Sequence, residues 1–140
     1  IIAHFRNKGI KIYLDTNGTL YEKFSKIAAL VDYIAMDIKL PSSCGVEYWQ
    51  EHSEFLKLAK NNIFIKIVLT AKSTYDEFEK AVEMVRKIDK SIPVVLQPVT
   101  PVGDVKPMPF ESIRSLKEFA EQKLENVSII PQLHKKLGIR

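Results

Sequence analysis

An apolar run ends at Leu14-Asp15-Thr16-Asn17-Gly18, and four later runs also end on a polar or charged group. Those four endings are Asp37-Ile38-Lys39, Phe64-Ile65-Lys66, Leu96-Gln97-Pro98-Val99-Thr100 and Pro131-Gln132-Leu133-His134. Polar strand ends are typical of parallel α/β folds, in which ligands bind where the strands finish. We therefore expect the chemistry of this chain at the carboxyl edge of a parallel sheet.

The segments between these endings alternate between strand and helix patterns. Predicted strands span about 11–15, 33–39, 64–69, 93–98 and 127–131, and predicted helices span about 20–30, 46–60, 74–89 and 109–125. Ser73 or Thr74 caps the third helix with Glu77 behind it, whereas 41–45 is predicted as a loop. Four strand–helix repeats predict an α/β fold with right-handed crossovers, in one domain over residues 1–140.

Strand periodicity assigns the polar groups to one face of the sheet. Side chains alternate between faces, so Ile34, Met36 and Ile38 are expected under helices. The opposite face would carry Asp15, Asp37, Lys39, Lys66, Gln97 and Gln132. Small and charged residues on that face suit the lumen of a barrel that opens to solvent, and the prediction is a partial (β/α) barrel like that of triosephosphate isomerase.

Composition restricts the function classes. The 140 residues include 21 Lys and Arg against 17 Asp and Glu, and the two signs alternate along the predicted helices, which argues against a nucleic-acid interface. No apolar run approaches the ~20 residues that cross a bilayer, so no membrane contact is expected. Cys44 is the single cysteine, so it forms no internal disulfide, and a reducing cytoplasm is the expected location.

Two charged pairs have alternative explanations. Asp15 and Asp37 would end adjacent strands about 4.8 Å apart, where they favour a bound cation or a shared proton. Alternatively, each caps the next helix or pairs with a lysine. Lys39 and Lys66 would bind an anionic ligand group or pair with those same carboxylates.

The remaining polar groups are also open to two explanations. Gly18 allows a ligand to approach the backbone after the first strand, or only allows a left-handed turn. Gln97 reads an adenine edge or ribose, or forms a hydrogen bond in the barrel wall. His134 is expected at the surface beside lysines, and Cys44 is expected to be a spectator because no His is placed to activate it.

Residues 10–140 resemble the radical S-adenosylmethionine (SAM) superfamily. The ending at Leu14–Gly18, followed some twenty residues later by Asp37-Ile38-Lys39, looks like the third and fourth strands of that barrel. Within the superfamily the chain is most similar to the 7-carboxy-7-deazaguanine synthase family. That likeness is carried by Pro41-Ser42-Ser43, by Leu96–Val99 and by the ending Pro131–Arg140.

The resemblance implies a set of site residues. It implies SAM binding by Gly18, Asp37, Ile38, Lys39, Gln97, Pro98, Val99 and Thr100, and substrate binding by Thr16 and by the terminal carboxylate of Arg140. The implied reaction converts 6-carboxy-tetrahydropterin to 7-carboxy-7-deazaguanine, a carbon–nitrogen lyase step toward queuosine or archaeosine. It requires a [4Fe-4S] cluster, SAM and Mg²⁺, and it proceeds through a 5′-deoxyadenosyl radical.

The sequence departs from the family pattern in two ways. The three-cysteine cluster loop and the glycine-rich second strand are missing, and Asp15 stands where glutamate is expected as often as aspartate. The chain also begins within a helix that closes at Gly9. We therefore expect a fragment that is inactive alone, binds no cofactor firmly and self-associates through the edge at residues 11–15, with a homodimeric parent. Asp15 resembles the cation-site aspartate of glycyl-radical activating enzymes such as pyruvate formate-lyase activase. Such an activase is one alternative, and a non-catalytic α/β binding module is the other.

Overall fold

A computed structural model describes residues 1–59, 62–101 and 103–131. Its five-stranded sheet contains β1 (Tyr13–Thr16), β2 (Tyr33–Lys39), β3 (Ile63–Leu69), β4 (Val94–Pro98) and β5 (Val127–Ile129). The strands lie in chain order, and every neighbouring pair is parallel. Consecutive parallel strands joined by helices form a partial (β/α) barrel, so the predicted fold class is confirmed.

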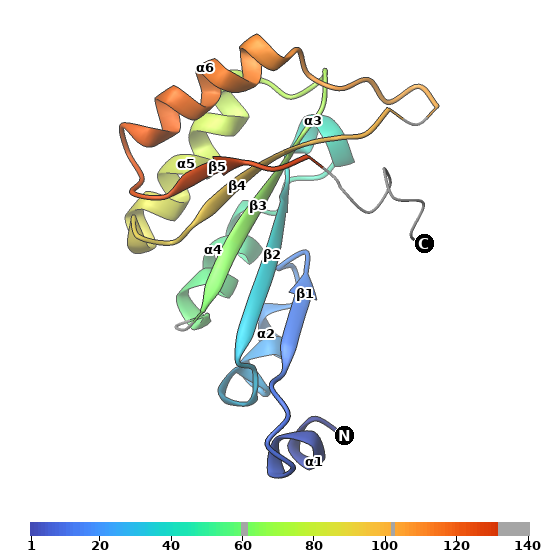
Figure 1. The fold of residues 1–140 in the computed structure, drawn as a ribbon, viewed down its shortest axis with the longest axis vertical. Coiled ribbons are helices and arrows are strands. Elements are labelled where there is room, and N and C mark those ends of the chain that lie inside the picture. The colour runs from blue at the N-terminus through green and yellow to red at the C-terminus, as the bar shows by residue number, and fades with distance from the viewer. Residues whose placement is uncertain (60–61, 102, 132–140) are drawn as a thin grey trace.

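The helices are α1 (Ile2–Asn7), α2 (Tyr21–Ser25), the 3₁₀ helix η1 (Ala28–Leu30), α3 (Pro41–Cys44), α4 (Trp49–Leu58), α5 (Tyr75–Asp89) and α6 (Phe110–Glu121). α4, α5 and α6 lie along one side of the sheet (Figure 1). α5 begins with the predicted capping box, because Thr74 Oγ1 accepts from the Glu77 amide and the Glu77 carboxylate accepts from the Thr74 amide.

Three predicted elements differ from the structure. The predicted loop at 41–45 contains α3, because Pro41 pre-sets the first helical φ and the Gly45 amide donates to the Pro41 carbonyl in a left-handed cap. The predicted helix over 20–30 is interrupted and continues as η1. The helix predicted from residue 46 begins only at Trp49. Four-residue helices are too short to show a 3.6-residue period, which explains why α3 was missed.

The core fills the space between the sheet and its helices. Ile65, Ile67 and Leu69 of β3 alternate with half-buried residues and have no exposed surface. On α5 the apolar stripe consists of Phe78, Ala81, Val82 and Val85, all fully buried. Each large side chain of this kind contributes roughly 1.5–3 kcal/mol on burial, so the helix face of the sheet holds most of the stabilisation.

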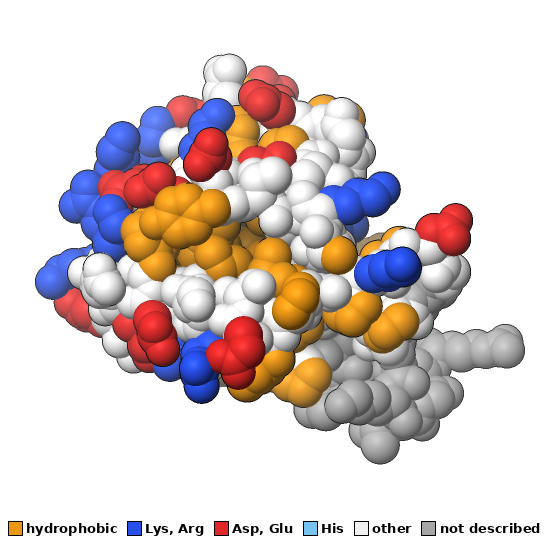
Figure 2. All heavy atoms as spheres, turned by 90° about the horizontal axis from the view of Figure 1, so that it is seen from above, with side chains coloured by type: hydrophobic (Ala, Val, Ile, Leu, Met, Phe, Trp, Pro, Cys, Tyr) orange, Lys and Arg blue, Asp and Glu red, His pale blue; other side chains and the backbone are white. Residues whose placement is uncertain are grey.

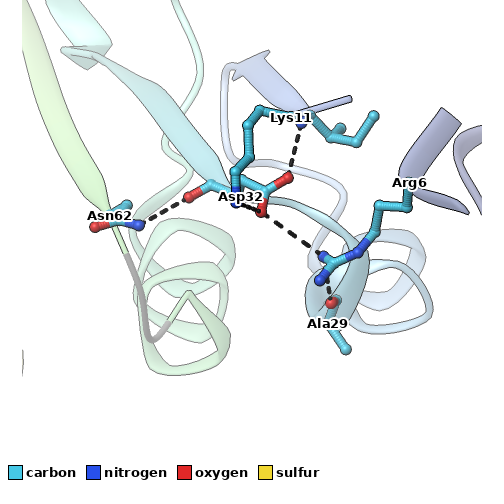
Figure 3. A network of polar contacts seen from close by, with 6 residues as sticks. Arg6, Lys11, Ala29, Asp32 and Asn62 are labelled. Atoms are coloured by element: carbon cyan, nitrogen blue, oxygen red, sulfur yellow. Dashed lines mark hydrogen bonds and ion pairs between the residues drawn. The ribbon is translucent and has the colours of Figure 1, made fainter. Parts of the chain in front are cut away.

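Asp32 joins the amino-terminal ends of the strands (Figure 3). Its carboxylate accepts from the Ile12 amide at 2.8 Å and lies 3.4 Å from Lys11 Nζ and 4.0 Å from the Arg6 guanidinium. Asn62 donates to the Asp32 carbonyl at 3.1 Å. The hydrogen bond from Ile12 lowers the pKa of Asp32, with partial burial acting against it and the two cations adding to it.

Replacing Asp32 with Asn should lower stability at pH 7 but not in acid. A carboxyl whose pKa is lowered on folding stabilises the fold above its ordinary value of 3.8 and loses that contribution as the pH falls through the folded value. Urea unfolding of both proteins from pH 7 to pH 3 should therefore give midpoints that converge below pH 4. The exposed Asp104→Asn variant is the control, and a gap that stays constant across this range contradicts the prediction.

Candidate functional site

The face of the sheet opposite α4, α5 and α6 carries the predicted polar residues. The register places Asp37 beside Lys66, and Val68 beside Gln97. Strand alternation then puts Asp15, Asp37, Lys39, Lys66 and Gln97 on this one face, which confirms the predicted convergence for these five. Gln132, His134 and Arg140 lie outside the described residues.

Lys66 lies between the two aspartates. Its Nζ is 2.8 Å from Asp37 Oδ1 and 3.2 Å from Asp15 Oδ1. The contact with Asp15 has hydrogen-bond geometry, whereas Asp37 Oδ1 is a close ion-pair partner without that alignment. The lysine-pairing explanation is therefore confirmed for both carboxylates, and a metal ion between them would have to displace this ammonium.

The electrostatics of this trio stabilise the charged lysine. Partial burial acts to lower the pKa of Lys66, but the contacts with Asp37 and then Asp15 outweigh it and raise that pKa above its ordinary value. The Lys66 side chain is 17% exposed, against 62% for Asp15. The site thus holds a charged Lys66 in place and leaves the Asp15 carboxylate accessible at the sheet edge.

The turn after β1 is held by its own side chains. Thr16 Oγ1 accepts from the Gly18 amide at 3.1 Å, and Asn17 Oδ1 accepts from both the Thr19 amide and the Thr19 hydroxyl. Gly18 has φ +66°, and a Cβ at this position would lie 2.4 Å from Met36 Cε. The glycine is therefore required by both the left-handed turn and the packing on β2, whether or not a ligand approaches it.

Gly18→Ala should destabilise the fold by about 1–3 kcal/mol, because the added methyl collides with a fully buried Met36 in a backbone conformation that L-residues disfavour. Thermal unfolding measures the loss. Gly103→Ala is the matched control, since Gly103 also has a positive φ but a methyl added there would meet no atom within 4 Å. Equal losses in the two variants would show that Met36 packing contributes nothing.

The segment after β2 is anchored to α5. The Ser42 amide donates to Glu77 Oε1 at 2.8 Å, and its hydroxyl donates to Oε2 at 2.6 Å. Burial acts to raise the pKa of Glu77, yet these bonds with Ser42 and Thr74 prevail and lower it. Ile38 is fully buried on the helix face, so its side chain is not available to a ligand on the polar face.

A cavity of about 300 Å³ opens just beyond the ends of β2 and β3, beside residues 104–106. It is lined by Ser42, Ser43, Thr70, Ala71, Lys72, Asp104, Val105 and Lys106. The residues from Thr70 on were not predicted from the sequence, although Thr70 directly follows β3. A larger cavity of about 540 Å³ lies at the amino-terminal ends of β3 and β4, but ligand chemistry in this architecture belongs to the carboxyl ends.

The end of the molecule seen from above carries mixed charge and exposed apolar groups. Figure 2 shows Lys and Arg side chains interleaved with Asp and Glu around a hydrophobic cluster.

Cys44 is exposed, and its Sγ lies 3.2 Å from the Val46 carbonyl. Within residues 1–59, 62–101 and 103–131, no three His, Cys, Asp or Glu side chains group as metal ligands. In the same ranges, every helix is too short or too polar to traverse a bilayer.

Comparison with known proteins shows which sequences the chain resembles. The chain is 37% identical over 131 residues to the 7-carboxy-7-deazaguanine synthase of Geobacter sulfurreducens and 27% identical over 137 residues to that of Methanopyrus kandleri. The resemblance to these synthases is confirmed. The alignments cover 92% and 96% of this chain but 52% and 51% of the synthases, so the chain spans about half the length of the curated relatives it matches.

A solved structure supports the fold. A radical SAM methyltransferase from Sphaerobacter thermophilus superposes with a TM-score of 0.65 at 14% identity, over 86% of this chain and 40% of that one. At this identity the likeness concerns the fold alone, which is the predicted barrel type. No protein-family model matches the chain.

Proposed function

We propose that the chain works as part of a radical SAM enzyme of the 7-carboxy-7-deazaguanine synthase type, converting 6-carboxy-tetrahydropterin to 7-carboxy-7-deazaguanine. The observation that carries the proposal is the 37% identity to such a synthase over almost the whole chain. The polar face of the sheet supports it, because it places charged groups of both signs at the edge where barrel enzymes bind ligands.

The site residues follow from this proposal. Gly18, Asp37–Lys39 and Gln97–Thr100 would line the SAM pocket through the ends of β1, β2 and β4, with Thr16 toward the substrate. Lys39 is exposed at the end of β2, where its ammonium suits a carboxylate. Gln97 to Thr100 are half-buried and follow the same edge, since the Val99 amide donates to the Leu69 carbonyl at 3.0 Å. Arg140 keeps its predicted substrate role.

The residues of this chain do not fit an iron–sulfur cluster. Such clusters are held by several thiolates, and the sequence contains one cysteine. Under this proposal, cysteines outside these 140 residues would hold the cluster. The Asp15 and Asp37 carboxylates are paired with Lys66, so a Mg²⁺ site there requires Lys66 to move. The chain's own contribution is binding and orientation of SAM and substrate.

The decisive assay uses a longer protein in which this chain is joined to a three-cysteine cluster segment. With SAM, dithionite and 6-carboxy-tetrahydropterin it should form 7-carboxy-7-deazaguanine, whereas the 140-residue chain treated with iron and sulfide should form neither product nor 5′-deoxyadenosine. Hydrogen abstraction from a protein glycine would instead indicate an activase. Failure to bind SAM would indicate a binding module.

Lys39→Ala in that longer protein should weaken SAM binding by about 1.5–3 kcal/mol, the usual loss for a charge-assisted contact. Isothermal titration calorimetry measures the change. The exposed Lys87→Ala on α5 is the control, because it removes the same charge far from the sheet edge. Equal affinities for Lys39→Ala and Lys87→Ala would remove Lys39 from the SAM site.

Self-association and location complete the proposal. Within the described sheet, β1 pairs only with β2, and Tyr13 on it is 57% exposed. An unpaired strand edge of this kind recruits other strands. We place the full enzyme in the cytoplasm as a homodimer, and the isolated chain should associate through this edge, which light scattering at rising concentration tests.

A further inference from the structure

His52 occupies an unusual position beside the turn after β1. It lies on α4 between core residues and is 2% exposed, and with Thr70 it is one of two buried polar residues in the described part of the chain. Its Nε2 is 3.0 Å from the Asn17 carbonyl oxygen. The ring therefore joins α4, on the helix side of the sheet, to the loop that follows the first strand.

The two ring nitrogens are not equivalent. A carbonyl accepts, so Nε2 must carry the proton and donate to Asn17. Nδ1 is buried and has no hydrogen-bond partner among the described residues. Burial lowers the pKa of His52, against the opposing effects of the Asn17 carbonyl and of Glu51, which agrees with a neutral ring. A buried acceptor without a partner is costly, and an apolar ring of similar size would avoid that cost.

Among the described residues, the only side-chain hydrogen bond of His52 therefore falls on the Asn17–Gly18 peptide group. Because Gly18 tolerates both signs of φ, the Asn17–Gly18 peptide can rotate at little steric cost from its own backbone. In the observed state the Asn17 carbonyl faces His52, and the Gly18 amide faces Thr16. Rotation would break both hydrogen bonds and turn the carbonyl away from α4.

We propose that His52 is a positioning residue that locks the Asn17–Gly18 peptide and so fixes the ligand-facing turn after β1. The inference rests on the proposed function for its ligand, SAM, but not for its geometry. His52 is 2% exposed and so offers almost no surface to a ligand. It acts through the Asn17 carbonyl, and its substitution should alter the turn and the affinity for SAM more than it alters the stability of the fold.

Nitrogen-15 spectra of the chain test the geometry without any ligand. The His52 ring should show a single neutral tautomer protonated at Nε2. In His52→Phe the Gly18 amide should exchange with deuterium at least tenfold faster than in the unsubstituted chain, and Ser53→Ala on the same helix should leave it unchanged. A ring protonated at Nδ1, or unchanged Gly18 exchange in His52→Phe, would overturn the proposal.

SAM titration of the longer protein tests the consequence. His52→Phe should bind SAM about tenfold more weakly, while His52→Gln, whose amide can donate to the same carbonyl, should recover most of the affinity. Equal affinity of His52→Phe and the unsubstituted protein would overturn the positioning role. If the unsubstituted protein binds no SAM, the proposed function fails, and the exchange experiment still decides the role of His52. Should His52→Phe not fold, the ring spectrum and His52→Gln decide it.

Discussion

Lys66→Met is expected to destabilise the fold by about 2–4 kcal/mol. Removing one partner of a buried ion pair commonly costs 3–5 kcal/mol, because the remaining charge is left without compensation. The expected loss is smaller here because the side chains of Asp37 and Asp15 are 25% and 62% exposed, so water can solvate the carboxylates that lose their partner. Urea unfolding with an unchanged denaturant slope measures it.

The matched control is Lys57→Met. Lys57 pairs with Glu54 on the surface of α4, where both side chains are more than one-third exposed. Surface pairs contribute little, so this variant should stay within about 0.5 kcal/mol of the original. Lys66→Met/Asp37→Asn should regain part of the loss, since it removes the uncompensated carboxylate. A Lys66→Met loss no larger than that of Lys57→Met would show that the ion pairs of Lys66 with Asp15 and Asp37 do not stabilise the sheet.

The largest loss is expected for Phe55→Ala, at about 3–5 kcal/mol, because truncation of a fully buried aromatic leaves a cavity. Phe55 is 1% exposed and stacks on Phe24 of α2 with ring centroids 4.2 Å apart. This contact fixes α4 beside α2. Thermal unfolding provides the measurement.

Phe110→Ala is the comparison, because Phe110 begins α6 with 63% of its surface exposed and should lose less than about 1 kcal/mol. Similar losses at the two positions would contradict the cavity argument. A Phe55→Ala protein that unfolds cooperatively but has lost the ring signature of His52 would further show that α4 is held in place by this stack.

Local periodicity explains which parts of the fold could be predicted. The strand and helix order, the capping box at Thr74 and the shared face of Asp15, Asp37 and Lys66 all follow from short-range patterns. What could not be predicted depends on contacts between distant positions. Lys66 meets Asp15 across 51 residues, and no local signal chooses between a lysine and a metal as the partner of that carboxylate.

The same limit applies to the turn after β1. The sequence identifies Gly18 as a turn residue but gives no sign that Met36 fills the space beside it. His52 lies 35 residues from Asn17. In the sequence pattern of a helix, nothing distinguishes it from other polar residues. A contact between a side chain and a distant backbone carbonyl produces no periodic sequence pattern, so it can be identified only from the folded structure.

The chain-order arrangement of β1 to β5 also bears on how the protein is made. In the described sheet, each strand pairs with the strand that was synthesised just before it. Each parallel pairing still joins residues twenty or more positions apart, as with Tyr13 and Tyr33, and closing such crossovers is slow, but domains generally fold as their amino-terminal parts emerge. The sheet can therefore grow by one strand–helix unit at a time during translation, with β1 remaining as one edge and each newest strand forming the other.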